Sequence, residues 1–88
     1  MPIIRLTNLY KTRTVIYQST NGDPIALEFN KLSESILIYR KGCLVNKVHA
    51  GCFYRYDAVD RTILVLPEVA EKIEHIAGIK LNAPNQLN

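Results

Sequence analysis

Short runs rich in β-branched and aromatic residues recur along residues 3–66, and within them, most cleanly at 25–30, hydrophobic and polar residues alternate. Because successive side chains of a strand point to opposite faces, this pattern is typical of β-strands with one buried face. Gly, Asn, Asp and Pro interrupt the alternation at short intervals, as they do in turns. The strands that we expect cover residues 3–6, 10–18, 25–30, 35–40, 44–48, 52–57 and 62–66.

The connection between the second and third expected strands contains Asn21-Gly22, a dipeptide that favours the tight turn of a β-hairpin. A two-residue loop at this position pairs Gln18 with Ile25 and Ile16 with Leu27. That register gathers the apolar side chains of both strands on one face, which we expect to be buried.

A single helix is predicted over residues 67–77. Pro67 suits the first helical position, where a missing N–H costs nothing, and Glu68 lies in the first turn, where the helix dipole favours an acid. Apolar residues of this segment recur at helical spacing. Gly78 provides a left-handed cap. We expect the polar segment 82–88 to be a flexible tail.

The expected fold is mainly β, of the α+β class, in one domain spanning residues 1–81. Residues 35–40 are apolar on both faces, which favours a central strand. Six to seven antiparallel strands would form a meander, closed by the C-terminal helix. The pattern leaves two arrangements open: a curled sheet with the helix on one face, or a small barrel.

The composition adds a mildly basic charge and few thiols. Of the 88 residues, 48% are hydrophobic and 22% charged, and the net charge is +3. That charge permits a polyanionic partner without requiring one. There are two cysteines, no stretch resembling a signal peptide, and no apolar run of the length that crosses a bilayer. We therefore expect a cytoplasmic protein without a membrane partner.

The segment 35–56 contains no Asp or Glu, and its cations are interleaved with aromatic residues. Rings that stack on bases and cations that neutralise phosphates are the usual elements of a nucleic-acid surface. If strands 44–48 and 52–57 form a hairpin through a loop at 49–51, several of these side chains share one face. An ordinary solvated face is the competing interpretation. The candidate nucleic-acid-binding residues are Arg40, Lys41, Lys47, Phe53 and Arg55.

Reactive side chains form no familiar constellation. The soft metal ligands Cys43, His49, Cys52 and His75 lack the spacing of a zinc site, and no Cys-x-x-Cys pair occurs. A nucleophile needs a base that a third group orients, and no such set stands out. We therefore assign no catalytic, cofactor-binding or metal-binding residue and expect no cofactor.

The function that we expect first is a small non-catalytic binding or regulatory module that acts through protein–protein contacts. Self-association as a homodimer is expected as well, because a meander leaves edge strands, such as 3–6 or 10–18, with unpaired backbone groups. A nucleic-acid-binding domain is the first alternative. A small RNA-cleaving enzyme centred on His49 is the second.

Overall fold

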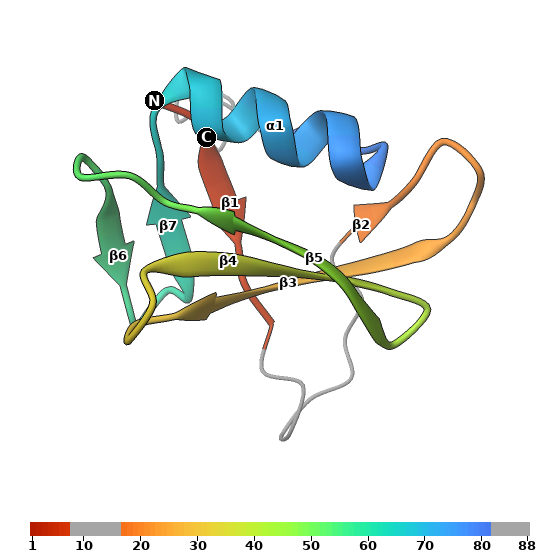
Figure 1. Ribbon diagram of the computed structural model, residues 1–88, viewed down its shortest axis with the longest axis horizontal. Coiled ribbons are helices and arrows are strands. Elements are labelled where there is room, and N and C mark those ends of the chain that lie inside the picture. The colour runs from red at the N-terminus through yellow and green to blue at the C-terminus, as the bar shows by residue number, and fades with distance from the viewer. Residues whose placement is uncertain (8–16, 82–88) are drawn as a thin grey trace.

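Seven strands and one helix make up the part of the chain that the computed structural model describes, residues 1–7 and 17–81 (Figure 1). The chain is mainly β with one C-terminal helix, as its hydrophobic pattern predicts. The elements are β1 (Ile3–Arg5), β2 (Tyr17–Gln18), β3 (Pro24–Asn30), β4 (Ser35–Arg40), β5 (Cys43–His49), β6 (Arg55–Asp57), β7 (Thr62–Leu64) and α1 (Pro67–Ala77).

The strands divide into two antiparallel sheets. One has the order β1-β7-β6, and the other is a four-stranded meander, β2-β3-β4-β5. β4 is a central strand of the meander, as its apolar faces predict. The first and last strands of the chain lie side by side, because Ile4 of β1 pairs with Ile63 of β7. The described strands do not close into a barrel; they form two separate sheets rather than one continuous meander.

The hydrophobic core lies between α1 and the inner faces of both sheets (Figure 1). In β3 and β4, Leu27 faces Ile38 across the sheet, and both side chains are fully buried. The helix adds Ile73 from its buried stripe. Burying an aliphatic side chain of this size contributes roughly 1.5–3 kcal/mol, so these residues hold the helix on the sheets.

The boundaries of α1 follow from the residues at its two ends. Pro67 is the first helical residue, and Gly78 caps the C-terminus in the left-handed conformation with φ of 67°. The Gly78 N–H donates to the carbonyl oxygen of Glu74 at 2.8 Å, which satisfies one carbonyl of the last turn. The helix therefore spans the predicted residues, whereas the predicted tail lies outside the described residues.

The register of the β2–β3 hairpin differs by one residue from the prediction. Tyr17, not Gln18, lies opposite Ile25, and the connection is a five-residue loop, residues 19–23. Ser19 holds this loop closed: its N–H donates to the carbonyl of Asp23 at 2.9 Å, and its Oγ accepts the Asp23 N–H at 3.0 Å. The shift turns Tyr17 toward the core. The expected position of Ile16 lies outside the described residues.

The predicted hairpin between residues 44–48 and 52–57 is wrong. β5 pairs with β4 through the tight turn at Lys41-Gly42, whereas β6 pairs with β7 in the other sheet. The chain leaves β5 after His49 and crosses between the sheets. Aromatic packing explains the crossing, because Phe29 of β3 lies 5.2 Å from Tyr54 and 5.1 Å from Tyr56 between ring centroids. These contacts join the two sheets and hold the β6 segment away from β5.

Candidate functional site

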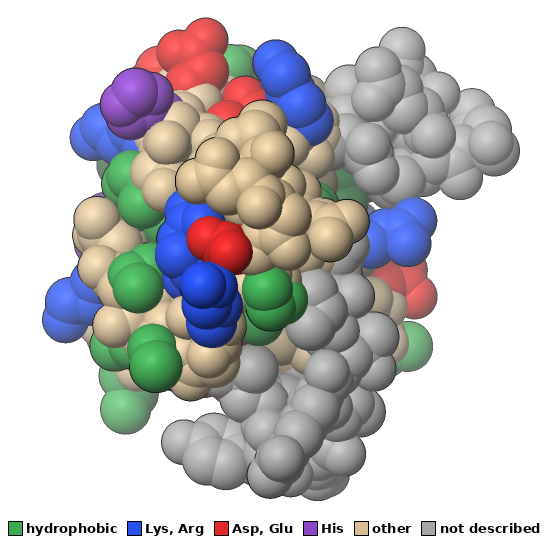
Figure 2. All heavy atoms as spheres, turned by 90° about the vertical axis from the view of Figure 1, so that its right-hand side faces the viewer, with side chains coloured by type: hydrophobic (Ala, Val, Ile, Leu, Met, Phe, Trp, Pro, Cys, Tyr) green, Lys and Arg blue, Asp and Glu red, His purple; other side chains and the backbone are tan. Residues whose placement is uncertain are grey.

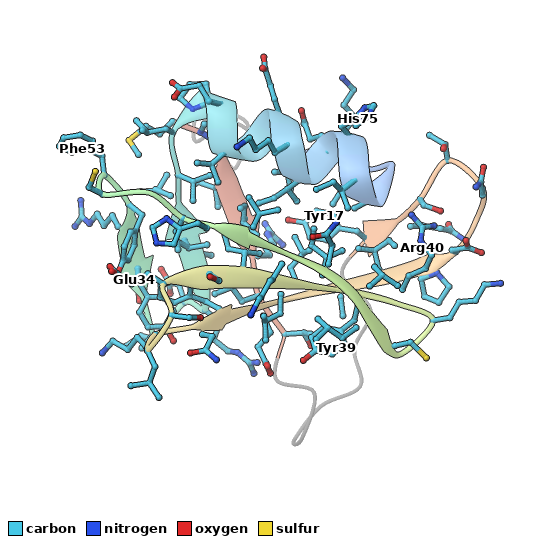
Figure 3. The ribbon with its side chains drawn as sticks, in the orientation of Figure 1. Tyr17, Glu34, Tyr39, Arg40, Phe53 and His75 are labelled. Atoms are coloured by element: carbon cyan, nitrogen blue, oxygen red, sulfur yellow. The ribbon has the colours of Figure 1, made fainter. Side chains whose placement is uncertain are left out.

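Arg40, the first of the candidate nucleic-acid contacts, is bound within the protein. Its Nη1 lies 2.9 Å from Oδ2 of Asp23, and its Nη2 donates to the carbonyl oxygen of Ala77 at 3.1 Å. One guanidinium thus connects β4, the β2–β3 loop and the C-terminus of α1. A cation at a helix C-terminus also interacts favourably with the helix dipole. Figure 3 shows Arg40 directed toward the loop.

Lys41 is the neighbour of this ion pair. Its Nζ lies 3.5 Å from the other carboxylate oxygen of Asp23, and 69% of its side chain is exposed. In Figure 2, which views this end of the molecule, a red carboxylate lies against blue cationic side chains. The hydrogen bond from Arg40 lowers the pKa of Asp23, and Lys41 adds to this, although partial desolvation opposes it.

The five candidate nucleic-acid contacts do not form one patch. Arg40 and Lys41 lie at the β4–β5 turn, and Lys47 lies on β5. Phe53 follows β5 at the opposite end of the molecule, as Figure 3 shows. Arg55 belongs to β6 in the other sheet. The shared face predicted for Lys47, Phe53 and Arg55 is absent because the hairpin that would create it does not form.

The aromatic residues between the sheets have a structural role. Tyr54 donates its hydroxyl hydrogen to Oε2 of Glu34 at 2.8 Å, and its ring meets Phe29 edge to face. The hydrogen bond to Glu34 is the first cause that raises the pKa of Tyr54, followed by desolvation. Phe53, which precedes Tyr54 in the chain, is two-thirds exposed.

β5 is the long edge of the four-stranded sheet. Within the described residues it pairs with β4 on one side only. Ala50 donates its N–H to the carbonyl of Glu34. Along an antiparallel pair of strands, every second residue bonds to the partner strand, so this bond shows which residues of β5 bond to β4. Val48, which lies two residues earlier, therefore bonds to β4. The backbone groups of Lys47 and His49 point away from β4, toward the edge.

A second hydrogen bond gives the same alternation. Lys41 donates its N–H to the carbonyl of Pro24, so on β4 Tyr39 and Leu37 bond to β3. Ile36 and Ile38, which alternate with these residues on β4, therefore bond to β5. This agrees with the pattern that the Ala50 hydrogen bond gives. At the edge, the N–H of Lys47 donates locally to Oδ1 of Asn46 at 2.8 Å. Asn46 thus covers one edge donor with its own exposed side chain.

The side chains of β5 are unusually open for a strand, with six of the seven residues exposed. Two are apolar: Leu44 is 55% and Val45 49% exposed. Val45 is the extra residue of a bulge opposite β4, between the pairs that involve Ile38 and Tyr39. The face of the sheet away from α1, here called the outer face, carries Lys47 together with its cross-strand neighbours, and Figure 3 shows Tyr39 on that side.

The other described edges offer less backbone for pairing. On β1, the N–H of Arg5 points outward and donates to the hydroxyl oxygen of Tyr17 at 3.0 Å. Burial raises the pKa of that Tyr17 hydroxyl, which keeps it protonated. β6 has three residues, of which only Tyr56 directs its backbone away from β7. The expected edge strand 10–18 lies outside the described residues except for Tyr17–Gln18.

The remaining chemistry is sparse in the described residues. Nδ1 of exposed His49 accepts the N–H of Gly51 at 3.2 Å, and both cysteines are exposed thiols. In residues 1–7 and 17–81 no three metal-ligating side chains cluster. An open groove of about 540 Å³ lies between the β2–β3 loop and the end of α1, where Glu74 accepts the Leu81 N–H. No helix in these ranges is long and apolar enough to cross a membrane.

Sequence reasoning found β5 but missed its edge. The signal was the consecutive apolar pair Leu44-Val45, which breaks the alternation of the strand and marks the bulge. No protein-family model, no curated protein and no solved structure matches the chain significantly.

Proposed function

We propose that this protein is a non-catalytic binding module that acts through protein–protein contacts, with the edge of β5 as its binding surface. The observation that carries the proposal is the edge itself. It directs the backbone of Lys47 and His49 outward and exposes the apolar side chains of Leu44 and Val45. An extended segment of another chain adds to such an edge by continuing the sheet.

The edge of β5 is a better binding surface than the exposed apolar residues in the turns. Leu32 is 99% and Val59 91% exposed, but each is a single apolar side chain in a turn. Scattered residues of this kind are normal on protein surfaces. On β5, by contrast, apolar side chains stand beside the outward-facing backbone groups of Lys47 and His49, so one partner segment contacts both.

Self-association is the second candidate, through the same edge. The backbone of β5 is complementary to itself, so two copies could pair antiparallel about a two-fold axis and form a continuous eight-stranded sheet. The observation that favours this is again the exposed apolar pair. Its test is sedimentation velocity over a range of protein concentrations, where a Leu44→Ser variant should associate less than the wild type.

The test of the proposed function is selection of random peptides of roughly a dozen residues on the immobilised full chain, followed by a footprint of the selected binders. Cys43 lies on β5 and Cys52 beyond it, and both are exposed. A peptide on the edge should slow alkylation of Cys43 while Cys52 reacts as before. Equal protection of both thiols, or a selection that yields no binder, would reject the proposal.

Two variants make the footprint specific. His49→Pro removes an edge-directed N–H and the imidazole acceptor of the Gly51 N–H, but no hydrogen bond to β4, so it should weaken peptide binding while circular dichroism stays native. Leu44→Ser removes an apolar contact at the edge, and Leu32→Ser makes the same change at an exposed turn. Binding should fall for Leu44→Ser and persist for Leu32→Ser. The reverse order would place the binding surface elsewhere.

A further inference from the structure

We propose that the segment that adds to β5 is acidic: an extended stretch of another protein with carboxylates at alternate positions, opposite Lys47 and His49. This inference rests on the proposed function and names the chemistry of its partner. It follows from where the charged side chains of the sheet lie and from which residues of β5 direct their backbone groups to the open edge.

The edge strand carries Lys47 and His49 but no carboxylate of its own. No Asp or Glu occurs between Ser35 and Tyr56, the segment that contains β4 and β5. The nearest carboxylates are already engaged: Asp23 binds Arg40, and Glu34 accepts the hydroxyl of Tyr54.

Glu28 is the remaining carboxylate near this row of the sheet. It pairs with Leu37, which in turn pairs with Lys47, so two strand spacings separate Glu28 from Lys47. Their backbones are about 10 Å apart, and the two side chains form no ion pair in the structure. Within the described residues, Lys47 forms no ion pair.

The geometry of a paired strand places alternate residues of the partner beside Lys47 and His49. Lys47 and His49 are two residues apart, so their side chains share one face. A residue directly opposite on an added strand has its Cβ about 5 Å from the Cβ of Lys47, and an opposite charge there stabilises the pair. Nδ1 of His49 accepts the Gly51 N–H, which leaves Nε2–H to donate to a second carboxylate.

The same geometry distinguishes the acidic segment from the other possible occupants. A second copy of β5 offers Lys47 no carboxylate, because the strand contains none. A nucleic acid would need cations along one track, but Arg40 is paired with Asp23 and Arg55 lies in the other sheet. An acidic extended segment satisfies the backbone, the charges and the exposed apolar side chains together.

The experiment uses the peptides selected on the full chain, tested again on charge-reversal variants. The recovered sequences should be enriched in Asp and Glu relative to the starting library, and their affinity should fall with added salt. Lys47→Glu should weaken a recovered acidic peptide about fivefold and strengthen its Lys-substituted counterpart by a similar factor. Lys72→Glu, on the exposed side of α1, makes the same change in net charge and should leave both affinities unaltered.

Each other outcome separates this inference from the proposed function. Peptides that protect Cys43 but are neutral or basic overturn the acidic partner and leave strand addition intact. Failure of any peptide to protect Cys43 overturns both. Equal effects of Lys47→Glu and Lys72→Glu would assign the preference to net charge rather than to the edge. An oligouridylate that displaces the peptides and itself protects Cys43 would replace the acidic protein with RNA.

Discussion

Replacing Arg40 with methionine should destabilise the fold by about 2 kcal/mol, although the sequence alone suggests that Arg40 is a nucleic-acid contact. Methionine keeps the aliphatic length of the side chain and removes the guanidinium. The change breaks the contact with Asp23 at 2.9 Å and the hydrogen bond to the Ala77 carbonyl at 3.1 Å. It also removes the cation from the C-terminus of α1.

The magnitude follows from these contacts. A hydrogen bond that involves a charged group contributes about 1.5–3 kcal/mol when buried, and a cation at a helix C-terminus about 0.3–1 kcal/mol. The Arg40 side chain is 26% exposed, so solvent screens part of both contributions. We therefore expect the lower half of their combined range, which corresponds to a fall of roughly 10 °C in Tm for a domain of this size.

The assay is urea unfolding followed by circular dichroism, with Lys41→Met as the matched control. Lys41 loses the same type of charge one residue away, but its side chain is 69% exposed and lies 3.5 Å from Asp23. Its loss should change the free energy of unfolding by less than about 0.5 kcal/mol. Equal effects of the two variants, or an Arg40→Met variant as stable as the wild type, would refute the structural role of Arg40.

The difference between wild type and Arg40→Met should also depend on pH. The folded pKa of Asp23 is lowered, so its contribution is fully present above the ordinary value of 3.8. It is lost as the pH falls through the lowered folded pKa, because the protonated carboxyl no longer pairs with Arg40. The two stability curves should therefore approach each other in acid, while the hydrogen bond to the Ala77 carbonyl keeps them from meeting. Parallel curves down to the acid transition would show that Arg40 does not act through Asp23.

Four further variants test other parts of the structure by urea unfolding. In Tyr17→Phe, loss of the hydroxyl that accepts the Arg5 N–H should lower stability by about 1 kcal/mol at neutral pH. Burial raises the folded pKa of Tyr17, so the advantage of the wild type over this variant is present below pH 10.0. It declines as the pH rises through that folded pKa. Ile73→Ala should cost about 3 kcal/mol, and the half-buried Ile76→Ala clearly less, since only Ile73 leaves a fully enclosed cavity. Gly78→Ala should cost about 1 kcal/mol, because φ is 67° while the added Cβ would meet Thr20 Oγ1 at an ordinary 3.5 Å.

The parts of the fold that the sequence predicts are those set by local patterns. Pro67 and Gly78 mark the ends of α1 by their own backbone preferences. β4 is central because both of its faces are apolar. Each of these features is determined within a few residues, so no knowledge of distant partners is needed.

The parts that sequence reasoning missed depend on contacts between distant residues. The β2–β3 register depends on Ser19 closing a five-residue loop, which the Asn21-Gly22 signal does not reveal. The position of β6 depends on Tyr54 packing against Phe29 in another sheet. Both contacts form only after the chain has folded back on itself.

The candidate site was missed for the same reason. Arg40 is structural because Asp23 and the end of α1 meet it in space. The edge at Lys47 could be identified only once the hydrogen-bond phase of β5 against β4 was known. A basic stretch of sequence indicates neither which cations are already paired nor which backbone groups point to solvent.

Amide hydrogen exchange at His49 tests the account of the β5 edge most directly. The His49 N–H points away from β4, whereas the neighbouring Val48 N–H bonds to β4, so His49 should exchange much faster than Val48 in the protein alone. A bound acidic peptide should slow exchange at His49 and leave Val48 unchanged. Protection of His49 without a peptide, or no change at His49 when the peptide binds, would contradict the account.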